Sequence, residues 1–170
     1  MKPARPGKGR PWTFLILPKE ASSKLPTRAM TSVRGLINGR PFRATLEPDG
    51  KKSHWLKVEE KLRAAADAKP GDMIELEISP IERQPEPRIP ADLRTALATN
   101  KAARMVWSEI TAIARRDWIQ WITSAKLPET RARRIQSGCE MLAAGKRRVC
   151  CFDRSGFYSK GLGAPEAAEL

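Results

Sequence analysis

The chain has 170 residues, of which 41% are hydrophobic and 30% charged, and 32 Lys and Arg against 19 Asp and Glu give a net charge of +13. This length predicts one large domain or two small ones, and no run approaches the ~18 apolar residues that a membrane span needs. No apolar signal core of sufficient length follows the basic N-terminus, and an odd number of cysteines, three, is typical of free thiols in a reducing cytoplasm. We therefore expect a cytoplasmic protein, and its positive net charge predicts polyanionic partners.

The first half of the chain predicts a β-rich domain over residues 12–82. Residues 1–11, rich in Pro, Gly, Lys and Arg, predict a disordered basic arm before it. Apolar runs and alternating patterns predict five strands, at Trp12–Leu17, Thr31–Ile37, Arg40–Leu46, His54–Val58 and Met73–Ile78. One short helix is predicted at Glu59–Ala66. The pair Asn38-Gly39 favours a type I′ hairpin turn, because both residues tolerate positive φ. Pro41, near the start of the strand Arg40–Leu46, suggests an edge position for that strand.

The second half predicts a helical module over residues 91–146, after a proline-rich linker at residues 83–90. Residues of one apolar face recur at spacings of three and four, which indicates one helix or two meeting near Thr111: Trp107, Ile110, Ala114, Trp118, Trp121, Ile122 and Ala125. Pro128 predicts the first turn of a last helix, where its missing N–H does no harm. We therefore expect a tryptophan-rich inner face and a basic outer face that includes Arg115, Arg116, Asp117 and Gln120.

The end of the chain predicts a flexible tail over residues 147–170, because Gly145 is a natural helix stop and glycines recur beyond it. The tail contains Cys150 and Cys151 beside two arginines, which can lower the pKa of a thiol. The favoured interpretation is that both are incidental thiols that oxidise readily in vitro. Cys139 is expected to be a small core residue.

Two groups of motifs, in this order, resemble the YdeI/OmpD-associated family. Val33–Leu46 (VRGLINGRPFRATL), followed by Pro48-Asp49-Gly50, His54-Trp55-Leu56 and Gly71-Asp72, is similar to the N-terminal barrel of that family. Ile89–Leu93, Trp121-Ile122 and the run Ala125–Ile135 (AKLPETRARRI) resemble its helical C-terminal domain. The resemblance spans Trp12 to Gly145, most of the chain.

This resemblance implies an α+β fold, in which a small double-split β-barrel of AbrB-like build precedes a helical module of three to four helices. The family is labelled as bacteriocin protection or stress-associated, and its molecular activity is not established. No catalytic residue is carried over to this chain. The barrel is expected to supply the scaffold and a homodimer contact.

Basic residues near the start of the predicted last helix are the candidate anion or nucleic-acid site, because backbone N–H groups and the helix dipole favour anions there. These residues are Lys126, Thr130, Arg131, Arg133 and Arg134, together with Arg115 and Arg116. The alternative interpretation is a solvated basic face with Glu129 as a partner.

Trp118, Trp121 and His54 are the candidates for a second kind of site, a tryptophan-lined groove between barrel and helices that would hold a small molecule. The alternative for the tryptophans is core packing. His54 is the sole histidine and has no placeable carboxylate partner, so neither a catalytic site, a metal cluster nor a cofactor is predicted.

Three hypotheses follow in order of preference. The first is a non-enzymatic binding or regulatory module for nucleic acid or another anion, and the second is a small-molecule-binding stress protein. The third is an enzyme, which a deep pocket around His54 with a perturbed carboxylate would favour.

Overall fold

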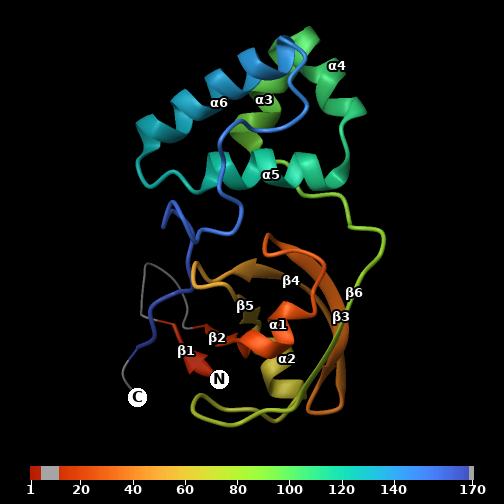
Figure 1. Cartoon of the computed structure of the whole chain (residues 1–170), viewed down its shortest axis with the longest axis vertical. Helices are drawn as coiled ribbons and strands as arrows, with labels where there is room; N and C mark the ends of the chain where they lie inside the picture. Colours follow the sequence, from red (N-terminus) through yellow and green to blue (C-terminus); the bar gives the residue numbers. More distant parts are fainter. Residues whose placement is uncertain (5–11, 169–170) are drawn as a thin grey trace. The chain divides into compact units, whose positions relative to one another are not determined.

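The computed structural model describes residues 1–4 and 12–168, and these form an α+β protein with two compact units (Figure 1). The β unit comprises Met1–Arg83 and Asp153–Leu170, and the helical unit comprises Gln84–Phe152. The predicted arm falls mainly on residues 5–11, which lie outside the described residues. Before them, Lys2–Pro3 forms a short strand, β1, rather than part of an arm.

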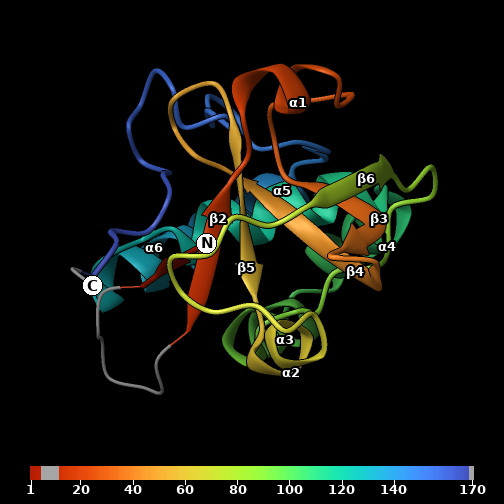
Figure 2. The ribbon, with the colours of Figure 1, turned by 90° about the horizontal axis from the view of Figure 1, so that it is seen from below.

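The β unit contains a six-stranded antiparallel sheet with the order β1-β2-β5-β4-β3-β6 (Figures 1 and 2). The strands after β1 are β2 (Thr13–Ile16), β3 (Thr31–Ile37), β4 (Arg40–Pro48), β5 (His54–Val58) and β6 (Leu76–Pro80). Two short helices, α1 (Lys19–Ser23) and α2 (Glu60–Ala65), complete the unit. The sequence predicts α2, but no helix is predicted after Pro18, where the short α1 forms.

Strand β4 joins two parts of this sheet. It pairs with β3 from Arg40 to Leu46, but with β5 only at Glu47 and Pro48. Strands β4 and β5 therefore diverge from the C-terminal end of β4 (Figure 2). The described pairings leave β1 and β6 as separate edges, an open sheet rather than a closed barrel. The expected edge position of β4 is wrong, because β4 lies inside the sheet; Pro41 is tolerated because the side toward β5 is unpaired there.

The turn between β3 and β4 has the predicted chemistry. Asn38 and Gly39 have φ values of 46° and 74°, both in the left-handed region. The Asn38 side chain also accepts from the Glu75 backbone N–H at 2.9 Å and donates to the Ala66 carbonyl at 3.1 Å. Strand β6 therefore begins at Leu76, opposite Ile37, and not at Met73 as predicted, because the residues before Leu76 face the turn instead of a strand.

The helical unit, residues 84–152, has four helices: α3 (Ala91–Thr99), α4 (Lys101–Glu109), α5 (Ala112–Thr123) and α6 (Pro128–Ala143). Side chains cap two of them, since Asn100 accepts from the Ala103 N–H at 3.0 Å and Thr111 from the Ala114 N–H at 3.2 Å. Thr111 is thus the point where two helices meet. Pro128 opens α6, as its position in the sequence predicts.

Each unit has its own apolar core. Leu15, Val33, Ile37, Leu46, Leu56 and Val58 are among the residues of the β-unit core. The helical core contains the predicted apolar face, including Trp107, Ile110, Ala114, Trp118 and Ile122, together with Cys139 and Leu142 of α6. Cys139 is therefore a core residue.

The polar side of α5 differs from the prediction, because Arg116, Asp117 and Gln120 are buried instead of exposed. Segments before and after the helices cover part of this side. Arg116 donates to the Gln84 side chain at 2.8 Å, and Arg148 lies 3.7 Å from the Asp117 carboxylate. Both partners come from connecting segments whose position a helical periodicity does not reveal.

The predicted tail divides between the two units. Residues 147–152 stay with the helical unit, and residues 153–168 belong to the β unit. In the β unit the Ala168 N–H donates to the Pro3 carbonyl at 3.0 Å, and the Asp153 carboxylate accepts from the Tyr158 and Ser159 N–H groups at 2.8 and 2.9 Å. Over the described residues, no helix combines the length and apolar character that crossing a bilayer requires.

Candidate anion-binding site

The first turn of α6 has backbone donors that no capping side chain satisfies. The N-cap residue Leu127 makes no side-chain cap hydrogen bond, and the first helical bond runs from the Arg131 N–H to the Leu127 carbonyl at 3.0 Å. The N–H groups of Glu129 and Thr130 precede that bond, so they lack helical acceptors. They carry the positive end of a 16-residue helix dipole.

Two exposed cations lie within this first part of α6 or directly before it. Lys126 is two residues before Pro128, and Arg133 is in the second turn. Among the residues that the structure describes, it records no ion pair for either side chain, and none between Arg133 and Glu129. Thr130 is half-buried between them. These three residues and the Glu129 N–H form what we call the α6 start.

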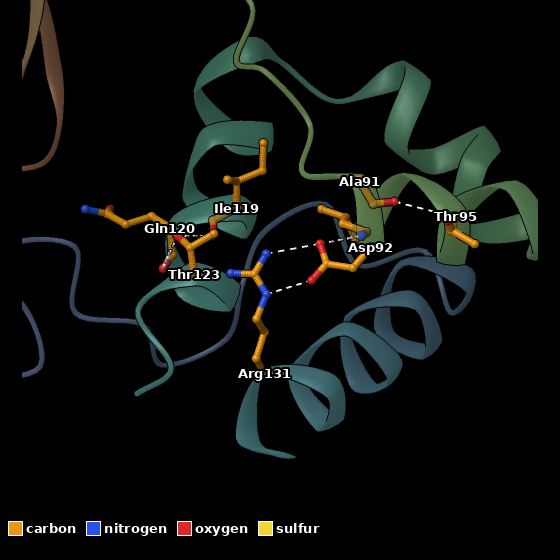
Figure 3. Close-up of polar contacts among 8 residues, drawn as sticks. Ala91, Asp92, Thr95, Ile119, Gln120, Thr123 and Arg131 are labelled. Carbon is orange, nitrogen blue, oxygen red and sulfur yellow. Dashed lines mark hydrogen bonds and ion pairs between the residues drawn. The ribbon is translucent and has the colours of Figure 1, made fainter. Parts of the chain in front are cut away.

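Arg131 has a different role, because its guanidinium pairs with Asp92 in the first turn of α3. The Nε and Nη2 atoms donate to the two carboxylate oxygens at 2.7 and 3.0 Å, and Figure 3 shows the side chain extending toward α3. The hydrogen bonds from Arg131 hold the pKa of Asp92 below its ordinary value, and Asp92 raises the pKa of Arg131. This pair connects α6 to α3.

Arg134 is also held within the helical unit. Its Nη1 atom donates to the Trp121 carbonyl and, at 3.1 Å, to the Ser124 hydroxyl at the end of α5. The guanidinium carbon lies 5.5 Å from the centroid of the Trp121 ring, a cation–π distance. Arg134 therefore supplies a donor to one carbonyl in the last turn of α5.

The two arginines of α5 are structural as well. Arg115 forms a two-bond contact with Glu86, at 2.8 and 3.0 Å, and donates to the Trp107 carbonyl at 2.8 Å. Arg116 is buried and bonded to Gln84. Of the seven predicted anion-binding residues, only Lys126, Thr130 and Arg133 thus stay together at the α6 start.

The three groove candidates do not meet in either unit. Trp118 and His54 are fully buried, one in the helical core and one in the β unit. Trp121 is half-buried, with its ring edge-on to Trp118 at a centroid distance of 6.0 Å. Gly138 of α6 lies against both rings. These contacts agree with core packing of the tryptophans, the alternative stated from the sequence.

His54 is a neutral core histidine that connects three segments of the β unit. Its Nε2 atom lies 3.0 Å from the Ala29 carbonyl, which can only accept, so Nε2 carries the proton. Nδ1 then accepts from the Ser22 hydroxyl at 2.7 Å. Burial lowers the pKa of His54. Ser22 is also fully buried, so this serine–histidine contact is closed to a substrate.

A ligand-sized cleft that the sequence did not suggest lies in the β unit where β4 and β5 diverge. It has a volume of about 580 Å³, and α2 forms one wall. Half-buried Glu47 lines it, and burial raises the pKa of this carboxyl while Lys57 opposes that shift. Nothing local in the sequence marks Glu47, because the cleft arises from the divergence of the strands. No cluster of three metal-ligating side chains occurs in residues 1–4 and 12–168.

Each of the two parts of the chain matches a known family model. Residues 86–145 match the family model described as Bacteriocin-protection, YdeI or OmpD-Associated. Residues 4–78 match the model described as Domain of unknown function (DUF1905). No curated protein and no solved structure matches significantly. These matches confirm the resemblance found in the sequence.

Proposed function

We propose that this chain, whose residues 86–145 match the bacteriocin-protection, YdeI or OmpD-associated family model and whose residues 4–78 match a domain of unknown function, is a non-enzymatic binding protein of the stress-associated type. Its helical unit recognises a polyanion, with nucleic acid as the preferred class. It acts in the cytoplasm. The observation that carries this proposal is the α6 start, where unfilled backbone donors adjoin exposed Lys126 and Arg133.

The charge of the helical unit supports this proposal. Residues 84–152 contain thirteen Arg and Lys and six Asp and Glu. Four of the six carboxylates pair with Arg115, Arg131, Arg147 and Arg148. Exposed cations such as Lys126 and Arg133 are left to attract phosphates, which bind well to helix N-termini. The contact is to the phosphate backbone, so it predicts little sequence preference.

The experiment that tests this function is fluorescence anisotropy of labelled duplex and single-stranded DNA at several salt concentrations. Each phosphate contact releases counterions, so affinity should fall linearly on a log–log plot against salt. Binding no stronger than that of an unrelated protein with the same net charge and size would overturn the proposal.

A second candidate function is the binding of a small molecule in the cleft between β4, β5 and α2. The observation that favours it is Glu47, a carboxyl with a raised pKa beside Lys57 in a concave site. The variant Ala65→Trp places an indole at the cleft wall, while Ala64→Trp adds the same side chain at an exposed neighbour outside the lining. A thermal-shift hit that survives both substitutions would argue against this site.

We infer further that this open sheet is a variant of the double-split barrel build that the resemblance implies, and that it contributes a homodimer contact. Support comes from β4, which passes from the β3 pair to the β5 pair as a shared strand. Light scattering on the purified chain tests the dimer, since a monomeric mass at all concentrations would contradict it.

A further inference from the structure

Cys150 and Cys151 are both exposed, and their Sγ atoms lie 3.0 Å apart. In an extended chain, consecutive side chains point to opposite sides. Here Cys151 has a φ of 58°, and the resulting turn brings both sulfurs to one side. The third cysteine, Cys139, is buried in the helical core and takes no part.

The separation of these sulfurs suits a covalent bond between them. A disulfide has an S–S length of about 2.05 Å, so the two atoms must approach by about 1 Å. Consecutive Cα atoms are about 3.8 Å apart, closer than in an ordinary disulfide, and the resulting strain makes such a bond easy to reduce. The hydrogen bond between the two thiols raises the pKa of Cys151, and Lys146 opposes that shift. Lys146, Arg147 and Arg148 precede the pair with only Val149 between, and their positive charge attracts anionic reagents.

We propose that Cys150 and Cys151 form a vicinal dithiol that a small anionic disulfide, such as oxidised glutathione, converts reversibly into an intramolecular disulfide. One protein thiolate attacks a glutathione sulfur, forms a mixed disulfide and releases one glutathione thiolate. The neighbouring thiolate then attacks the protein sulfur of that mixed disulfide, closes the Cys150–Cys151 bond and releases the second glutathione. Two protein thiols lose two protons and two electrons, and the glutathione disulfide is reduced to two thiols.

The position of the pair gives this oxidation a structural consequence. The helical unit ends at Phe152, and the chain re-enters the β unit at Asp153. The new bond closes a small ring that contains the peptide bond between Cys150 and Cys151. This ring lies one residue before the point where the chain passes from one unit to the other, and it restricts the backbone there. Glutathione reduces the bond again, so the modification responds to the redox poise of the cytoplasm.

The test uses the reduced full-length chain, incubated with oxidised glutathione, then denatured and alkylated for intact mass spectrometry. The expected product has lost two of its three alkylatable thiols and carries no glutathione. Cys139→Ser should behave in the same way. Cys150→Ser and Cys151→Ser should each stop at the mixed glutathione adduct. A stable glutathione adduct on the unsubstituted chain, or three thiols that stay free, would overturn the proposal.

A second measurement tests whether the two sulfurs act together without oxidation. Phenylarsine oxide bridges neighbouring thiols, so the reduced chain should bind one equivalent and lose two alkylatable thiols. Both single-serine variants should lose this binding, whereas Cys139→Ser should keep it. Binding that persists in either Cys150→Ser or Cys151→Ser would contradict a paired site.

Discussion

Arg131 and Asp92 join the first turns of α6 and α3 through two parallel hydrogen bonds, of 2.7 and 3.0 Å (Figure 3). The sequence presents Arg131 as an anion-binding residue, but its anion is a carboxylate of the same unit. Both side chains are partly exposed, which limits the strength of the pair through solvent screening. Arg131 is therefore a structural residue beside the α6 start, not a member of it.

Replacing Asp92 with Asn should lower the free energy of unfolding by about 1 kcal/mol, because the pair loses its charge complementarity. The folded pKa of Asp92 is lowered, so its contribution is present above the unfolded value and is lost as pH falls through the folded pKa. Urea denaturation at neutral and acidic pH measures both effects. Glu129→Gln, in the first turn of α6, is the control, and an equal loss in both variants would contradict the role of the pair.

His54 should make the stability of the chain depend on pH near neutrality. Its folded pKa is lowered by burial, so below about 6.5 the unfolded chain binds a proton that the folded chain resists. The contribution of His54 to the free energy of unfolding is expected to be complete above that pH and to decrease as pH falls below it. Since His54 is the only histidine, no other imidazole contributes. Urea denaturation at pH 7.5 and 5.5 measures the change, and His54→Gln should reduce it.

The partner of His54 can be removed separately. Ser22→Ala leaves Nδ1 buried without its donor, at a cost of about 1–3 kcal/mol. Ser23→Ala is the matched control, because Ser23 is exposed and its hydroxyl donates to the nearby Glu20 carbonyl. Similar unfolding midpoints for the two variants would show that the Ser22–His54 contact does not stabilise the β unit.

Two glycines should respond oppositely to the same substitution. A Cβ at Gly35 of β3 would lie 1.8 Å from the Glu77 carbonyl oxygen of β6, so Gly35→Ala should cost about 3 kcal/mol or more. At Gly138 the nearest atoms are ring carbons of Trp121 and Trp118 at 3.6 and 3.7 Å, an ordinary contact. Gly138→Ala should stabilise α6 by up to about 1 kcal/mol through helix propensity. Thermal denaturation of both variants measures the contrast, and a stable Gly35→Ala protein would contradict the close β3–β6 approach.

Local chemistry is what the sequence predicts well here. Asn38-Gly39, Thr111 and Pro128 each determine a turn or a helix end through their own backbone preferences, and the structure confirms all three. The periodicity of the tryptophans likewise predicts the helical core. These signals lie within a few residues of the feature that they determine.

Contacts between distant residues were not predictable in the same way. Arg131 and Asp92 are 39 residues apart, Arg116 and Gln84 are 32 apart, and the Ser22–His54 contact also spans 32 residues. A cluster of arginines in a sequence gives their charge but not their partners. Four of the five arginines proposed for the anion site therefore became structural, and Arg133 with Lys126 remained exposed.

The most direct test of the α6 start compares the salt dependence of DNA binding for Lys126→Gln/Arg133→Gln with that for Lys19→Gln/Lys24→Gln. Both double variants remove two exposed cations, the second pair at α1 of the β unit. The first variant should bind more weakly, and the slope of log affinity against log salt should decrease in magnitude by about two. The second should keep the slope of the unsubstituted chain. Equal losses in both variants, or an unchanged slope in the first, would contradict phosphate binding at the α6 start.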